Sequence, residues 1–281
     1  MSLQIDNGKL VQVYKILVDG IKKYTEEHDF KKVVIGLSGG IDSAVVCFLA
    51  KEAVGAENVL GVAMPSKYSS MKSEEYAEKL AKRCGIEFKV VPISKMYDSY
   101  LEVLEKDLGG NEDEKIEIYH QNLQARIRGM VLMAFSNRFG GLVLATGNRS
   151  EAMMGYCTLY GDTVGGLAPI SNVFKAGVYA LAKYINTGKE IIPLEIINRV
   201  PSAELKPDQA DHHSLPPYEI LDEILYLYLN RGKSSKDLIN QGFEEAIVKE
   251  IISTIDKTEY KRAQCPCGIN VSMDMYLSEM N

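Results

Sequence analysis

The segment Ser38-Gly-Gly-Ile-Asp-Ser43 carries the residue types that bind a phosphate group. It joins a β-branched run at residues 32–37 to an apolar stretch that predicts a helix. Such a turn brings backbone N–H groups and the Ser38 and Ser43 hydroxyls to one helix N-terminus, which favours an anion. The Asp42 carboxylate would repel that anion unless a cation lies between them. We therefore expect a nucleotide that is bound together with Mg²⁺.

This loop differs from two common phosphate-binding loops. No Lys follows its second glycine, as a Walker A loop requires, and its glycines do not follow the G-x-G-x-x-G spacing. The alternative is an ordinary strand-to-helix turn with a capping Ser and Asp. Two adjacent glycines and three polar residues exceed what capping needs, so we favour the phosphate site.

Short apolar runs alternate with helical patterns, which predicts an α/β fold with a doubly wound parallel sheet and extra C-terminal helices. The predicted strands are residues 32–37, 59–64, 87–93 and 141–146. The predicted helices are residues 43–53, 73–84, 117–138, 175–184, 218–230 and 244–256. Ligands bind beyond the carboxyl ends of such strands, so segments 38–43, 65–70 and 147–151 should face one crevice.

Composition and charge limit the classes of protein to consider. The chain has 281 residues, of which 46% are apolar and 25% charged, as expected for a single globular domain over residues 1–281. Its net charge of −6 argues against a nucleic-acid partner. No apolar run reaches the length of a membrane span and no signal peptide is recognisable, so we expect a cytoplasmic protein without membrane contact.

The predicted helix 117–138 has an apolar stripe and two polar flanks. The predicted core residues are Leu123, Ile127, Met130, Val131 and Ala134. Asn122 and Arg126 share one flank, and Arg128 lies on the opposite flank. A solvent-exposed arginine is the alternative interpretation for both arginines.

Two irregular stretches follow the last predicted strand. Residues 155–166 are glycine-rich and too long for a simple turn, which favours a binding loop. Residues 200–217 contain four prolines and mixed charge, so we expect either a linker or a mobile lid there.

The five cysteines do not indicate a disulfide framework, and Cys47 in an apolar helix is expected to be a core residue. Cys265-Pro-Cys267 supplies too few ligands for zinc without a second pair or a nearby His, so we expect a surface turn in the tail.

The Ser38–Ser43 loop resembles that of the N-type ATP pyrophosphatases, which split ATP into AMP and pyrophosphate. Five further blocks look like NAD⁺ synthetases, most of all like the synthetase portion of the glutamine-dependent enzymes. They are Asn122-Leu-Gln-Ala-Arg-Ile-Arg-Gly129, Ala145-Thr-Gly-Asn-Arg-Ser-Glu151, Gly155-Tyr-Cys-Thr-Leu-Tyr-Gly-Asp162, Pro201-Ser-Ala-Glu-Leu205 and Glu259-Tyr-Lys-Arg-Ala-Gln264.

The resemblance implies a two-step reaction with ATP as co-substrate. The nicotinate carboxylate of deamido-NAD⁺ attacks the α-phosphorus of ATP and releases pyrophosphate, and ammonia then displaces AMP from the acyl-adenylate. Adenylation gives the carboxylate a leaving group, so the protein mainly positions the reactants and neutralises charge.

The resemblance also assigns roles to residues. Asp42, Glu151 and Lys175 would be catalytic, and Asp42 and Glu151 would hold Mg²⁺. The residues implied for ATP are Gly36, Leu37, Ser38, Gly39, Gly40, Ile41, Asp42, Ser43, Thr146, Lys175 and Ser202. Those implied for deamido-NAD⁺ are Asn122, Arg126, Glu151, Tyr156, Tyr260 and Lys261. A Glu that merely favours the start of a helix is the alternative for Glu151, whereas a Lys there is unfavourable, so an anionic ligand would explain Lys175.

The chain departs from the ammonia-dependent branch of the family. Leu159 and Gly166 stand where that branch commonly has Lys and Asp, and both suit the glutamine-dependent branch. The chain leaves no room before the loop for an amidase domain, so ammonia would come from solution or from a separate amidase subunit. The family further implies a homodimer.

Two other functions remain open from the residues. One is a different ATP pyrophosphatase, such as a GMP-synthetase-like or tRNA-thiolating enzyme, against which the five blocks argue. The other is a non-catalytic nucleotide sensor, which would need lesions in the loop, and the loop is complete.

Overall fold

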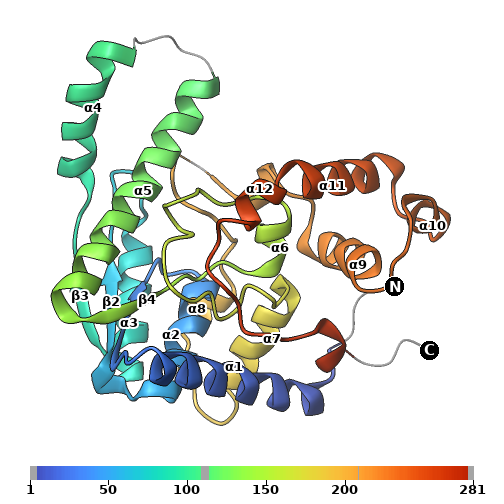
Figure 1. Cartoon of the computed structure of the whole chain (residues 1–281), viewed down its shortest axis with the longest axis horizontal. Coiled ribbons are helices and arrows are strands. Elements are labelled where there is room, and N and C mark those ends of the chain that lie inside the picture. Colours follow the sequence, from blue (N-terminus) through green and yellow to red (C-terminus); the bar gives the residue numbers. More distant parts are fainter. Residues whose placement is uncertain (1–4, 109–113, 208, 278–281) are drawn as a thin grey trace.

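The computed structural model describes residues 5–108, 114–207 and 209–277. Within them, four parallel strands form one sheet in the order β3-β2-β1-β4. The strands are β1 (Lys32–Gly36), β2 (Val59–Ala63), β3 (Glu87–Val90) and β4 (Gly141–Leu144). The chain steps outward from β1 to β3 and then returns to place β4 against the other edge of β1 (Figure 1). This reversal confirms the predicted doubly wound α/β fold.

Helices cover both faces of the sheet, and the residues of β1 alternate between the two. Val33 and Ile35 belong to one hydrophobic cluster and Val34 to another. The helices of the first layer are α1 (Asn7–Glu27), α2 (Ile41–Val54), α3 (Met71–Cys84) and α7 (Lys175–Ile185). Those of the second are α4 (Ser94–Leu108) and α5 (Glu114–Phe139), which lie side by side (Figure 1). Parallel strands covered on both sides are apolar throughout, which is why β2 and β4 are fully buried and read as uninterrupted apolar runs. Strand β3 at the edge carries Glu87 and Lys89 and is largely exposed.

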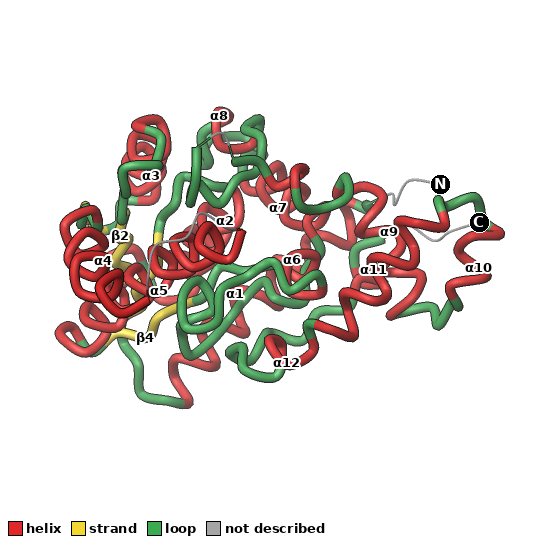
Figure 2. The backbone as a smooth tube through the Cα atoms, turned by 90° about the horizontal axis from the view of Figure 1, so that it is seen from above, coloured by secondary structure: helices red, strands yellow, loops and turns green. Residues whose placement is uncertain are grey.

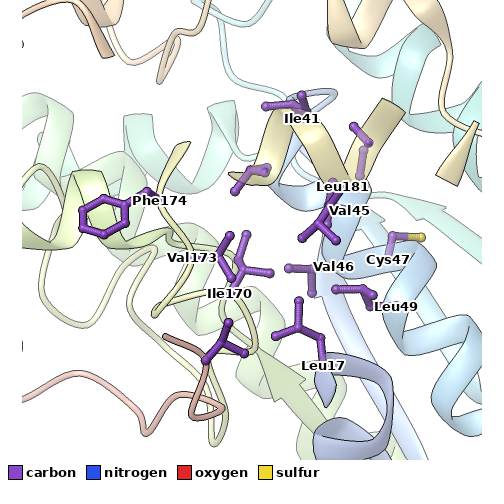
Figure 3. Packing of buried hydrophobic residues seen from close by; sticks show 14 of the residues in the cluster. Leu17, Ile41, Val45, Val46, Cys47, Leu49, Ile170, Val173, Phe174 and Leu181 are labelled. Carbon is purple, nitrogen blue, oxygen red and sulfur yellow. The ribbon is translucent and has the colours of Figure 1, made fainter. Parts of the chain in front are cut away.

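The first layer holds the larger part of the core. Leu17 of α1 packs near Val46 and Leu49 of α2, and Leu181 of α7 lies close to Val45 (Figure 3). Helix α1 was not predicted, although its buried residues Leu10, Val13, Leu17 and Ile21 follow helical spacing.

The predicted core stripe of α5 is wrong at two positions. Met130 is 59% exposed, and Ala134 is also exposed. The residues that pack against the sheet and α4 are Leu123, Ile127, Val131, Leu132 and Phe135. Met130 instead faces outward beside Tyr100 of α4, whose hydroxyl lies 3.4 Å from its sulfur. The sheet contacts only one narrow face of α5. The apolar residue types alone do not show which face that is.

The remaining helices follow the sheet in sequence. They are α6 (Arg149–Met153), α8 (Leu194–Ile197), α9 (Tyr218–Leu229), α10 (Ser235–Asn240), α11 (Glu245–Lys257) and α12 (Glu259–Arg262). Short 3₁₀ turns occur at Ala56–Asn58, Asp211–His213 and Met273–Met275. Figure 2 shows α9, α10 and α11 together at the end of the molecule away from β2 and α3. The predicted extra C-terminal helices are therefore present. None of the helices that the structure describes combines the length and apolarity of a membrane span.

A buried carboxylate on α9 fixes the starts of α6 and α7. Asp222 is fully buried and accepts hydrogen bonds from the Ser150 hydroxyl at 2.5 Å and from the Ala176 N–H at 2.8 Å. The same hydroxyl accepts from the Lys175 N–H at 2.9 Å. Burial raises the pKa of Asp222 to about 6, and the bonds from Ser150 and Ala176 oppose that rise. Asp222 thus holds the backbone that presents Lys175.

We expect Asp222→Ala to lower the free energy of unfolding by about 3 kcal/mol, because it leaves the buried Ser150 hydroxyl and the partly buried Ala176 N–H without their acceptor. Denaturant unfolding of the variant measures this change. Asp19→Ala, at an exposed position of α1, is the control and should leave the midpoint nearly unchanged. Equal stability of the two variants would contradict the role given to Asp222.

Candidate active site

A cavity of about 450 Å³ lies beyond the carboxyl ends of β1, β2 and β4. Gly36, Met64 and Ala145, at or just past the ends of these strands, contribute to its floor. Its walls come from α5, the 155–166 loop, the segment after α8 and Lys261 of α12. Segments 38–43, 65–70 and 147–151 all contribute residues, as predicted from the strand ends. The cavity lies where the strand order reverses, the usual ligand position in this kind of sheet.

The Ser38–Ser43 loop forms the turn from β1 into α2. Gly39 has φ +74°, and a Cβ there would lie 2.4 Å from the Ser73 carbonyl oxygen, so only glycine fits. The Ser38 and Ser43 hydroxyls are 3.2 Å apart, and the Gly40 N–H donates to Ser38 Oγ at 3.2 Å. Gly40 is the N-cap of α2 and supplies no side-chain acceptor. The first N–H groups of this 14-residue helix are therefore available to an anion.

A buried lysine joins two carboxylates directly behind this loop. Lys175 is 1% exposed, and its Nζ lies 2.6 Å from Asp42 Oδ2 and 2.8 Å from Glu151 Oε1. Burial opposes a charge on Lys175, but the two carboxylates outweigh it and raise the pKa of the ammonium. Burial also raises the pKa of Glu151, to about 7, against the influence of Lys175. The three side chains form one charged cluster, which we call the Asp42–Lys175–Glu151 cluster.

Asn148 aligns the two carboxylates of this cluster. Its Nδ2 donates to Asp42 Oδ1 at 2.8 Å, and its Oδ1 caps α6 by accepting from the Glu151 N–H at 3.1 Å. Asn148 is fully buried, so both bonds form away from water.

The segment between α8 and α9 closes one side of the cavity. Asp211 accepts from the Tyr218 hydroxyl at 2.9 Å and from the Tyr156 hydroxyl at 3.2 Å. Tyr218 also lies 3.2 Å from Glu151 Oε1, and burial raises the pKa of this tyrosine. Ser202 on the same segment lines the cavity and donates to the Gln209 carbonyl at 2.6 Å. The linker interpretation of residues 200–217 is therefore wrong, because the segment forms part of the site.

The donor set of the cluster fits Mg²⁺. Asp42 and Glu151 offer two carboxylates next to an anion-binding helix start, and Mg²⁺ in nucleotide sites takes one or two carboxylates together with phosphate oxygens and water. Among the residues that the structure describes, no group of three or more His, Cys, Asp or Glu side chains could hold a metal by itself. An ion at this place would thus be bound jointly with a phosphate.

Arg128 is a cavity residue that the sequence did not single out for binding. Its Nε donates to the Met64 carbonyl at 3.0 Å. Burial lowers its pKa to about 10, and Glu204 and Asp162 oppose this from a distance. Within the described ranges no carboxylate pairs with it, whereas Arg199 on the same wall pairs with Glu204. Arg128 and Asn122 lie at opposite edges of the α5 face that lines the cavity. The sequence analysis assigned a binding role only to the flank that holds Asn122, so it missed Arg128.

Most of the predicted site residues come together in the cavity. Its lining includes Gly36, Leu37, Ser38, Gly40, Ile41, Asp42, Ser43, Asn122, Thr146, Glu151, Tyr156, Lys175, Ser202 and Lys261. Three lie outside the lining. Gly39 shapes the loop backbone, Arg126 is exposed and donates to the Leu159 carbonyl at 3.1 Å, and Tyr260 is 55% exposed. A ligand role for Arg126 and Tyr260 stays a prediction.

Asn148, Asp211 and Tyr218 were missed. Asn148 lies in the Ala145–Glu151 block that resembles the family, and this resemblance could have identified it as a site residue. Asp211 and Tyr218 lie in or just after the segment that was interpreted as a linker or lid, and nothing in their spacing pointed to the cavity.

Comparisons with known proteins agree with this geometry. The NAD synthase family matches residues 13–265. The glutamine-dependent NAD⁺ synthetase of Thermotoga maritima is 48% identical over 263 residues, which is 93% of this chain and 45% of that protein. The corresponding enzyme of Aquifex aeolicus is 46% identical and covers 93% of this chain and 46% of its own length. The chain spans about half the length of these curated relatives.

Solved structures give the same result. The glutamine-dependent NAD⁺ synthetase of Acinetobacter baumannii, solved with ADP, has a TM-score of 0.66 at 40% identity over 94% of this chain and 47% of that one. An NMN synthetase from Francisella tularensis has a TM-score of 0.76 at 26% identity, covering 90% of this chain and 95% of that one. With the family match extending over nearly the whole chain and the phosphate-binding loop and charged cluster inside it, the chain belongs to the NAD synthase family.

Proposed function

We propose that this chain converts deamido-NAD⁺ to NAD⁺, with ATP as the activating co-substrate and ammonia as the nitrogen donor. The observation that carries the proposal is the Asp42–Lys175–Glu151 cluster, which lies directly behind an anion-binding loop in a cavity large enough for small ligands. The reaction would release AMP and pyrophosphate through an acyl-adenylate.

The Ser38–Ser43 loop would bind the pyrophosphate that leaves. Its backbone N–H groups and two hydroxyls are fixed before the ligand arrives, so little reorganisation is needed as negative charge shifts onto the leaving group. Lys175 adds a positive charge that is held in place by both carboxylates. Mg²⁺, when bound at Asp42 and Glu151, would supply further neutralisation of the phosphates.

The acceptor would lie between α5, the 155–166 loop and α12. Asn122 accepts from the Thr158 hydroxyl at 2.7 Å, and Lys261 Nζ donates to the carbonyls of Gly155 at 2.7 Å and Cys157 at 2.8 Å. These bonds tie the three elements into one wall, and Tyr156 contributes an aromatic ring to it. A lysine ammonium has three donors, so Lys261 keeps one for a ligand.

The identity of the acceptor is supported by sequence rather than by shape alone. The curated relatives at 40–48% identity are named NAD⁺ synthetases, whereas the protein named NMN synthetase is 26% identical. We therefore propose the dinucleotide, and nicotinate mononucleotide is the acceptor to test against it. Ammonia would come from solution or from a separate amidase subunit, and a homodimer in the cytoplasm is proposed from the family.

The purified 281-residue chain should release AMP and pyrophosphate and form NAD⁺ only when ATP, Mg²⁺, deamido-NAD⁺ and ammonium are all present. Coupled detection of pyrophosphate and chromatography of NAD⁺ measure this. Glutamine alone should give no NAD⁺, and nicotinate mononucleotide should give at least tenfold lower kcat/KM. Turnover on glutamine, or preference for the mononucleotide, would overturn the donor or the acceptor assignment.

Asp42→Asn should reduce Mg²⁺-dependent turnover by about 10³-fold or more, because it removes one carboxylate from the cluster. The variant keeps the shape of the side chain, and Lys175 keeps Glu151, so the circular dichroism spectrum should stay native. Asp98→Asn, at an exposed position of α4, is the matched control. Unchanged turnover in Asp42→Asn would refute the assignment of the loop and the cluster.

Arg128→Ala should raise KM for one of the two anionic substrates by about 10- to 100-fold, because no carboxylate among the residues that the structure describes pairs with its guanidinium, which would bind a polyanion in the cavity. Arg128→Lys should recover part of this loss. Steady-state kinetics with each substrate varied in turn show which phosphate it binds. Arg83→Ala breaks a surface ion pair with Glu190 and should leave both KM values unchanged. If Arg83→Ala raised KM as much as Arg128→Ala does, Arg128 would act only through stability.

A further inference from the structure

An ion pair attaches the segment between α8 and α9 to the start of α3. Glu204 on this segment pairs through its Oε1 with Arg199 Nη2. The other oxygen of Glu204 accepts from the Ser73 hydroxyl at 2.8 Å and from the Ser70 N–H at 3.3 Å. Arg199 Nη1 in turn donates to Ser73 Oγ at 2.7 Å. These three side chains form the Arg199–Glu204–Ser73 network, and the reaction proposed above gives none of them a step.

This network is shielded from water to an extent that a neighbouring ion pair is not. The side chains of Arg199 and Glu204 are 23% and 18% exposed, and Ser73 is buried. Two residues after Glu204, Lys206 pairs with Glu117 of α5, and those side chains are 40% and 50% exposed. Surface ion pairs contribute little, whereas charge-assisted hydrogen bonds with little access to water are stronger. The segment therefore depends on its attachment to α3 more than on the ion pair with α5.

The backbone at Glu204 needs such an attachment. Its φ is +50°, in the left-handed region that residues other than glycine seldom adopt. The Glu204 N–H donates to Ser202 Oγ at 3.1 Å, and the Ser202 hydroxyl donates to the Gln209 carbonyl at 2.6 Å. A disfavoured conformation persists only where the surrounding structure holds it. The network supplies that support, and the turn at Glu204 keeps Ser202 on the cavity wall.

The same network reaches the phosphate-binding loop through Ser73. Gly39 of that loop packs on the Ser73 backbone so closely that a Cβ on Gly39 would lie 2.4 Å from the Ser73 carbonyl oxygen. The backbone of Ser73 thus supports the loop, while its side chain is bound to Glu204 and Arg199. One carboxylate therefore connects two sides of the cavity, the segment with Ser202 and the loop with Gly39.

We propose that Glu204 is a positioning residue that orders residues 200–207 against α3 before the nucleotide binds, and thereby strengthens the binding of ATP. A wall that is ordered in advance lowers the entropic cost of binding. Without the network, ATP has to order the segment itself, so affinity falls while the complex once formed stays similar. Because this role presumes that ATP is the co-substrate, it rests on the function proposed above.

Hydrogen exchange of the ligand-free chain, followed by peptide mass spectrometry, tests the ordering. Glu204→Asn is the informative variant, because asparagine tolerates the left-handed backbone but has a side chain one methylene shorter. Peptides within residues 200–207 should exchange about tenfold faster or more. Arg199→Ala should also speed this exchange, and the double variant should add little, because both changes break one pair. Lys206→Ala, which breaks only the exposed ion pair, is the matched control and should leave exchange nearly unchanged.

Calorimetry with ATP and Mg²⁺, without acceptor, tests the consequence for binding. Glu204→Asn should raise the Kd for ATP by about tenfold or more, and Lys206→Ala should not. At saturating ATP the kcat of Glu204→Asn should fall by less than about threefold, since bound nucleotide then orders the segment. A purely structural defect would instead lower kcat and the denaturation midpoint together.

Unchanged exchange in Glu204→Asn, additive effects in the double variant, or an equal response of Lys206→Ala would overturn the proposal. Native ATP affinity in Glu204→Asn would refute the positioning role alone. A wild-type chain that binds ATP but forms no NAD⁺ would refute the acceptor assignment and leave the positioning role intact. A wild-type chain that binds no ATP would refute both.

Discussion

The site is organised around one buried ammonium group. Lys175 is the first residue of α7, Asp42 lies in the first turn of α2, and Glu151 lies in α6, so the ion contacts join three helices that follow different parts of the sheet. A buried charge is tolerated only when it is paired and hydrogen-bonded, which makes the relative position of these helices strict. Asn148 and Asp222 both support this arrangement. Asn148 aligns the two carboxylates, and Asp222 fixes the start of α7.

The sheet explains why such a cluster can form next to a phosphate-binding loop. Strand β1 is central, with β2 on one edge and β4 on the other, so the loop after β1 and the helix after β4 project from the same end of adjacent strands. The crossover helices lie on opposite faces and leave the space between these loops open. Gly39 then lets α2 start close to Ser73 of α3, where a side chain would clash with the backbone.

The segments added after the sheet form walls of the cavity at the strand ends. Glycines at two contacts allow the 155–166 loop to pack tightly on α5, since a Cβ on Gly129 would lie 2.7 Å from the Tyr160 carbonyl oxygen and one on Gly161 would lie 2.8 Å from Ala125 Cβ. Lys261 then ties α12 to that loop through two carbonyls.

The sequence by itself determined the elements and the phosphate loop, because these depend on local patterns. Apolar runs and helical spacing placed all four strands and most long helices to within a few residues of their bounds. The glycines, the serine hydroxyls and Asp42 of the phosphate loop lie within six consecutive residues. The resemblance to a family added Glu151, Lys175 and Lys261, which no spacing connects. Only the tertiary structure decided that Lys175 bridges Asp42 and Glu151 and that Arg128 and Tyr218 belong to the site. These pairings join residues tens to more than a hundred positions apart, and their geometry depends on how helices pack, which is set by the whole core rather than by any local pattern.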